Sequence, residues 1–141
     1  MSARPIPRTL LVFSCLLVLA VPVGCGDGGG GNGQSAEDVA RAYVAARNAG
    51  DAVKLCELYA DELSKNVPGG DCRAFVTQQV RLDKKRSGTA RTGFIRVDAT
   101  GDQATAVLTL TQSGQTGQFS MPLTRQGGEW HIAGVNPITG Y

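Results

Sequence analysis

The chain has 141 residues, of which 14 are basic and 12 are acidic, so its formal net charge is +2. Arg4 and Arg8 stand before a long apolar run, and without them the 12 remaining basic residues balance the 12 acidic ones. A neutral chain has no overall field that attracts polyanions, so we expect no nucleic-acid partner. The length suits one domain with a single core of modest size.

The first 24 residues have the pattern of a cleavable export signal. Two arginines precede the apolar run Thr9–Val23 (TLLVFSCLLVLAVPV), which contains Pro22. A membrane-spanning helix needs about 20 apolar residues, and this run has about 15. The sequence therefore predicts a signal peptide over residues 1–24.

The junction Val23-Gly24-Cys25 resembles the lipobox of bacterial lipoproteins, in which a small residue precedes a lipid-modified cysteine. Pro22 stands where that family usually has an aliphatic residue. The resemblance implies cleavage before Cys25 and attachment of a diacylglycerol, with palmitate among its acyl chains, to the cysteine sulfur. It thus implies a lipid anchor at the extracytoplasmic face of the cell membrane. The alternative is an ordinary secreted protein that the general signal peptidase cuts nearby.

Residues 25–34 are expected to form the lipidated cysteine and a Gly-rich tether (CGDGGGGNGQ). A flexible chain from Gly26 to Gln34 has a root-mean-square reach of about 15–18 Å, which would hold a domain close to the bilayer. A phosphate-binding loop is the alternative, but no strand precedes this run and no Gly-Lys-Ser/Thr ending follows it.

Three helices are expected between Ser35 and Asp83. The first opens at a capping box, Ser35-Ala36-Glu37-Asp38, and ends at Gly50 in the left-handed conformation. The second is capped by Asp51, and the third spans about 71–83. The intervening residues 61–70 are interpreted as a polar connection, because Pro-Gly-Gly closes them and no apolar period runs through them.

The four cysteines predict one disulfide. Cys15 lies in the apolar leader and Cys25 is the lipidation candidate, which leaves Cys56 on the second helix and Cys72 at the start of the third. A pair of cysteines in an exported domain favours a disulfide. A disulfide that closes a loop of about 15 residues stabilises the folded domain by about 3 kcal/mol. The alternative, a metal site, lacks ligands because His131 is the single histidine of the chain.

A cluster of basic residues follows the third helix. Cations near the carboxyl end of a helix interact favourably with its dipole, and we expect that role here. The alternative is contact with anionic lipid headgroups, which a short tether would allow. The cluster consists of Arg81, Lys84, Lys85, Arg86 and Arg91.

The remaining residues alternate between apolar and polar side chains and contain short Gly turns. We expect strands over about 92–98, 103–111, 117–124 and 129–135, with Pro137 ending the last one. This pattern is typical of antiparallel hairpins with one covered face. The order of elements predicts an α+β fold of three N-terminal helices packed on a curved four-stranded antiparallel sheet.

Two runs resemble the nuclear transport factor 2-like superfamily, which has a cystatin-like roll. They are Ala42–Asp51 (AYVAARNAGD) and the closing Gly127–Ile132 (GGEWHI), and the resemblance covers Ser35 to Val135 within a domain of residues 35–141. It implies a cone-shaped roll whose sheet and helices enclose a pocket. Members include ketosteroid isomerases, polyketide cyclases of the SnoaL type, scaffold proteins and uncharacterised exported lipoproteins.

Four aromatic residues are candidates for lining that pocket: Tyr43, Tyr59, Phe119 and Trp130. For Phe119 and Trp130 the alternative is a place in the core. His131 falls on the face opposite Trp130, so we expect it to be solvated rather than an acid–base catalyst. No residues match a catalytic motif of the family, and we expect no catalytic residues, metal or cofactor.

These observations lead to one functional hypothesis and two alternatives. The first is a non-enzymatic, lipid-anchored domain outside the cytoplasm that binds a small apolar ligand or a partner protein of the cell envelope. The second is an isomerase- or cyclase-like enzyme, which requires an Asp, Glu or His with a raised pKa in the cone. The third is an envelope scaffold that forms a homodimer.

Overall fold

The computed structural model describes residues 33–87 and 90–136 of the chain. The predicted signal peptide (1–24), Cys25, most of the Gly-rich tether and Pro137 lie outside the described residues. The elements in chain order are α1 (Ala36–Ala49), α2 (Ala52–Leu58), α3 (Asp61–Lys65), α4 (Cys72–Ser87), β1 (Arg91–Thr100), β2 (Gln103–Gln112), β3 (Gln115–Gln126) and β4 (Glu129–Ile132).

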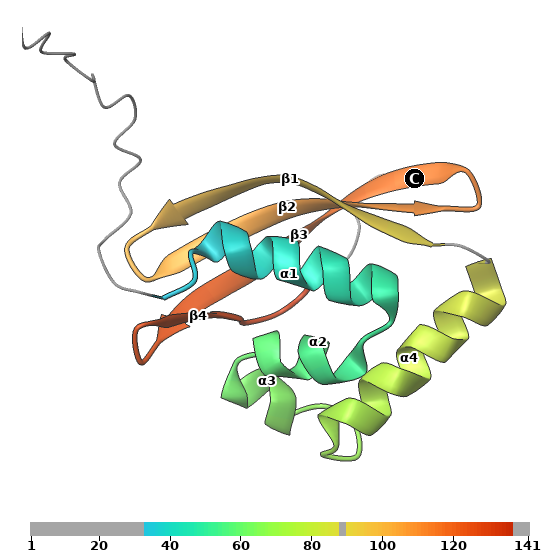
Figure 1. Ribbon diagram of the computed structural model, residues 1–141, viewed down its shortest axis with the longest axis horizontal. Coiled ribbons are helices and arrows are strands. Elements are labelled where there is room, and N and C mark those ends of the chain that lie inside the picture. The colour runs from blue at the N-terminus through green and yellow to red at the C-terminus, as the bar shows by residue number, and fades with distance from the viewer. Residues whose placement is uncertain (1–32, 88–89, 137–141) are drawn as a thin grey trace, which may run out of the picture.

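The strands form one antiparallel sheet in the order β1-β2-β3-β4. Figure 1 shows α1 lying along one face of the curved sheet, with α2 and α3 beyond it and α4 running back toward the start of β1. The register of β1 against β2 shifts between Phe94 and Arg96, and such a bulge bends a strand. The α+β fold with helices on a curved four-stranded sheet is therefore confirmed.

The core lies between α1 and the sheet. Every second side chain of the strands points into it. On β2 and β3, Ala106 pairs with Met121 and Leu108 pairs with Phe119, and all four side chains are buried. The alternate positions of β2, such as Thr105, point to the other face. Burial of one strand face against a helix supplies the main hydrophobic stabilisation of the sheet.

The first helix follows the pattern that its sequence predicted. The hydroxyl of Ser35 accepts a hydrogen bond from the backbone N–H of Asp38 at 3.1 Å, and the Asp38 carboxylate accepts one from the Ser35 N–H at 2.9 Å. The Ser35 hydroxyl also donates to the Asp38 carboxylate at 2.7 Å, and this bond, together with the one from the Ser35 N–H, lowers the pKa of Asp38 below its usual value. Val39, Tyr43 and Ala46 form the buried stripe that faces the sheet.

The structure differs from the expected elements at three places. Residues 61–65, expected as a polar connection, form the short helix α3, which lacks apolar periodicity because none of its residues is buried. Acidic residues in its first turn and Lys65 in its last suit the helix dipole. Helix α4 continues to Ser87, and β4 ends at Ile132 rather than Val135.

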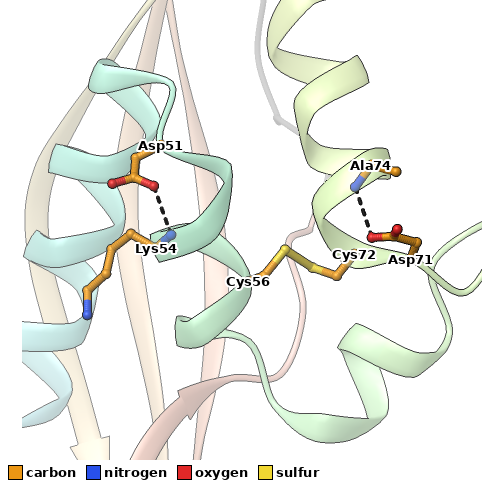
Figure 2. Close-up of a disulfide and its surroundings, with 6 residues drawn as sticks. All are labelled: Asp51, Lys54, Cys56, Asp71, Cys72 and Ala74. Atoms are coloured by element: carbon orange, nitrogen blue, oxygen red, sulfur yellow. Dashed lines mark hydrogen bonds between the residues drawn. A yellow bond between two sulfur atoms is a disulfide. The ribbon is translucent and has the colours of Figure 1, made fainter.

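Cys56 and Cys72 form the predicted disulfide, which joins α2 to the first turn of α4 (Figure 2). Their Cα atoms are 6.0 Å apart, within the normal range for a disulfide. Both helices are also capped near this bond: Asp51 accepts from the Lys54 N–H at 2.9 Å, and Asp71 accepts from the Ala74 N–H at 3.0 Å. The start of α4 is therefore fixed to α2 covalently.

Replacing both cysteines (Cys56→Ala with Cys72→Ala) is expected to lower the free energy of unfolding by about 3 kcal/mol, because the unfolded chain regains the freedom that the cross-link removes. Urea denaturation followed by circular dichroism measures this change. The wild-type protein under reducing conditions should match the double variant. An unchanged denaturation midpoint would contradict a stabilising disulfide.

Candidate ligand site

The candidate site begins where α1 ends. Gly50 has a φ of 72°, and its N–H donates back to carbonyl oxygens of the last turn of α1. A methyl group on Gly50 would lie 3.1 Å from Val80 Cγ1 and 3.7 Å from Lys84 Nζ, so α4 passes very close to this corner. The Lys84 ammonium therefore lies beside the carboxyl end of α1, where the helix dipole favours a cation.

Asn48 joins this end of α1 to the start of β1. Its Nδ2 donates to the Thr92 carbonyl oxygen at 2.9 Å, and the Thr92 N–H donates to Asn48 Oδ1 at 2.8 Å. The Asn48 amide thus makes the two hydrogen bonds to Thr92 that a neighbouring strand would otherwise make at this edge of the sheet. Thr92 is buried, and these bonds supply partners that its backbone groups need away from water.

An ion pair joins α1 to α4. The Arg47 guanidinium donates to the Asp83 carboxylate, and both side chains are partly exposed. An exposed pair of this kind contributes little stability on its own. Its structural effect is to place one cation and one anion at the mouth of the space between the two helices and the sheet.

These contacts surround a cavity of about 330 Å³ between the ends of α1 and α4 and the adjoining ends of β1 and β2. That volume lies within the roughly 300–1,000 Å³ typical of small-molecule sites. Three of its lining residues are basic, one is acidic and three are apolar. The lining consists of Arg47, Asn48, Val80, Asp83, Lys84, Ala90, Arg91, Thr92, Leu110 and Gln112.

The four aromatic residues expected at the pocket lie in or beside the core, and none of them lines this cavity. Phe119 and Trp130 are buried in the core, and the Arg125 guanidinium stacks over the Trp130 ring at 4.9 Å from its centroid. Tyr43 is buried one helical turn before Arg47, and Tyr59 is partly buried. Contact of these four residues with a ligand stays a prediction.

The two tyrosines are electrostatically linked to the cavity. Burial raises the pKa of Tyr43, with a smaller opposing effect from Arg47 and a further increase from Asp83. Burial also raises the pKa of Tyr59 to about 12, and Tyr43 adds to that increase. Both phenols therefore stay protonated at neutral pH and are hydrogen-bond donors there rather than bases.

His131, the remaining candidate from the sequence, lies away from the cavity lining. His131 pairs with Thr124 across β3 and β4 and faces away from the buried Trp130 and Ile132. Asp83 is the single acidic residue of the lining, and its carboxylate is held by Arg47, which leaves it poorly placed as a general base. Within residues 33–87 and 90–136, no three His, Cys, Asp or Glu side chains are grouped to hold a metal.

The sequence indicated some of the cavity and missed the rest. Lys84 and Arg91 belong to the basic cluster that follows the third predicted helix, and both line the cavity. The sequence does not point to Arg47, Asn48 or Asp83 as site residues, because nothing in a linear pattern places α1 beside α4. The spacing of Arg47 from Tyr43, one helical turn, is the signal that could have placed Arg47 at the end of the buried stripe.

No protein-family model and no curated protein sequence matches this chain. Solved structures do match it in fold. A SEC-C motif protein from Rhodopseudomonas palustris superimposes with a TM-score of 0.54 at 15% identity, covering 74% of this chain and 80% of that one. An uncharacterised cystatin-fold protein from Novosphingobium aromaticivorans gives a TM-score of 0.51 at 13% identity and covers 72% of this chain and 100% of that one. The chain has a cystatin-like fold.

A third solved structure shares this fold. The protein described as "Rd1NTF2_04 with long sheet" gives a TM-score of 0.52 at 19% identity and covers 70% of this chain and 100% of that one. Similarity at such low sequence identity establishes a shared fold but does not establish a shared activity.

Among the helices of the described residues, none has the length and apolar content required to span a membrane.

Tyr59 gives the folded protein a pH-dependent stability. Its pKa is about 12 in the folded state and about 10 in the unfolded chain, so the folded protein holds the proton more tightly. The contribution is complete below pH 10 and is lost as the pH rises toward 12. The free energy of unfolding is therefore expected to fall over this range.

A spectrophotometric titration of phenolate absorbance, together with urea denaturation at each pH, measures this effect. Tyr59→Phe should remove the titration near pH 12 and flatten part of the decline in stability. Titration of Tyr59 near pH 10 in the folded protein would contradict its burial.

Proposed function

We propose that this chain is a lipid-anchored extracytoplasmic domain that binds a small molecule with an apolar part in the cavity between α1, α4, β1 and β2. The observation that carries the binding role is the cavity itself, whose volume suits a small molecule. Its lining combines apolar side chains (Val80, Ala90 and Leu110) with charged and polar ones. Sites for small molecules commonly have this mixture, because apolar contact supplies affinity and a few polar groups fix orientation.

The packing of the core supports this location for the site. Tyr43, Phe119 and Trp130 occupy the space under α1 with their side chains buried. The cavity lies instead beside the carboxyl end of α4 and the first residues of β1. A ligand in this place would contact four elements at once, and those elements are held together by the contacts of Asn48 and Arg47.

The proposed anchor has separate support. Cys25 follows the apolar run Thr9–Val23 at the position of a lipobox cysteine, and a Gly-rich stretch separates it from α1. The disulfide between Cys56 and Cys72 is typical of proteins that fold in an oxidising compartment. An exported domain on a lipid anchor accounts for both features.

Filling the cavity tests the binding role. The protein isolated from membranes is expected to carry a small-molecule mass in native mass spectrometry, and Ala90→Trp should lose it because an indole occupies the cavity. Ala99→Trp is the matched control, since Ala99 is exposed on β1 and outside the lining. Equal retention of the added mass by both folded variants would refute the assignment of this cavity as the site.

Cys25→Ala tests the anchor. The variant is expected to lose incorporation of labelled palmitate and retention in the membrane fraction, because the sulfur that would carry the diacylglycerol is gone. Cys15→Ala, in the predicted signal peptide, should keep both properties. If Cys25→Ala still incorporates palmitate, Cys25 is not the acylated residue.

A further inference from the structure

The cavity lining has an excess of positive charge, although the domain as a whole has almost no net charge. Arg47, Lys84 and Arg91 line it together with a single carboxylate, that of Asp83. Outside the predicted signal peptide, basic and acidic residues are equal in number. The excess of cations in the lining is therefore a local feature of the fold and does not reflect the composition of the chain.

The three cations differ in their partners. Asp83 engages Arg47, and within the described ranges no carboxylate lies within ion-pair distance of Lys84 or Arg91. Lys84 and Arg91 are both exposed, and they come from α4 and β1, on either side of residues 88–89. Two cations that share a cavity repel each other, and an anion between them would remove that repulsion.

The same lining offers apolar contact. Val80, Ala90 and Leu110 line the cavity beside the cations, and Leu110 also packs against the core. A free inorganic anion would make no apolar contact with these side chains, and a wholly apolar molecule would form no ion pair with the two cations. A molecule that carries an anionic group on a short apolar body would satisfy both parts of the lining.

We infer that the cavity binds a small amphipathic anion, a carboxylate or phosphate group on a short apolar body, which Lys84 and Arg91 hold by charge-assisted hydrogen bonds. This inference rests on the proposed binding role of the cavity and names the chemistry of its ligand. The Arg guanidinium can bind a carboxylate or phosphate with two parallel hydrogen bonds, and the Lys ammonium adds a point charge.

The Lys84 ammonium also has a structural role at the end of α1, and the experiment has to separate the two. A cation that serves only the helix dipole would affect stability and would not distinguish an anionic ligand from a neutral one. Lys85, the next residue of α4, is exposed like Lys84 and does not line the cavity. It is therefore a matched control for the loss of one lysine from the same helix turn.

The anion has two sources that share this chemistry: a soluble organic acid, or the headgroup of an anionic lipid close to the tether. The test uses the full-length protein in nanodiscs of phosphatidylcholine, titrated with hexanoate and with 1-hexanol by isothermal calorimetry. Hexanoate is expected to bind more tightly than 1-hexanol by about a hundredfold, because the charge-assisted hydrogen bonds from Lys84 and from Arg91 contribute about tenfold each. Replacement of part of the lipid by phosphatidylglycerol would weaken hexanoate binding if a headgroup is the natural occupant, and would leave it unchanged if a soluble acid is.

Five variants complete the test. Lys84→Gln and Arg91→Gln should each weaken hexanoate binding by about tenfold and leave 1-hexanol binding unchanged. Lys84→Arg should retain hexanoate binding. The controls Lys85→Gln and Arg96→Gln should have no effect, since Arg96 is paired with Asp98 outside the lining.

Equal affinity for hexanoate and 1-hexanol would overturn the anionic class while leaving the cavity as a binding site. Equal weakening by Lys84→Gln and Lys85→Gln would overturn the assignment to the cavity cations. Absence of binding by both probes would overturn this inference together with the proposed binding role.

Discussion

The close approach of α1 and α4 at Gly50 is the constraint on which the candidate site depends. A side chain at this position would press on Val80, and the positive φ of Gly50 lets the chain turn away from α1 within one residue. Because the two helices meet here, Arg47 reaches Asp83, and Lys84 lies beside the end of α1. The close approach at Gly50 thus positions the three charged residues of the cavity mouth.

Two further connections keep that corner in place. The disulfide fixes the start of α4 to α2, one helix length away from the cavity, and Asn48 fixes the end of α1 to β1. A disulfide thus joins one end of α4 to α2, and the ion pair between Asp83 and Arg47 joins its other end to α1. The cavity is therefore bounded by elements that are held relative to one another, which lowers the entropic cost of ordering a ligand between them.

The cystatin-like fold determines which helices and strands surround the cavity, but it does not determine which side chains line it. Matches to proteins of this fold have 13–19% identity, which shows a common arrangement of helices and sheet. The charged lining comes from side chains of this sequence, with Arg47 and Asn48 on α1, Asp83 and Lys84 on α4, and Arg91 on β1. Function in such folds resides in residues of this kind rather than in the scaffold.

The sequence by itself determined the local structure of the described domain. Four features could be predicted because each depends on residues that are close together in the chain or on the number of cysteines available. They are the capping residues of α1 and α2, the glycine that ends α1, the alternation along β2 and β3, and the disulfide. Helix α3 escaped prediction because none of its residues is buried, so it has no apolar period to detect. Acylation of Cys25 and the ligand contacts of the aromatic residues stay predictions.

The tertiary structure alone decided where the site lies. The ion pair between Arg47 and Asp83 joins residues 36 positions apart, and the hydrogen bonds between Asn48 and Thr92 join residues 44 positions apart. The spacing of residues in a chain shows which face of an element is buried, but it does not show which two elements meet. That outcome depends on how the buried faces of α1, α4 and the sheet pack together, and packing is a property of the whole core.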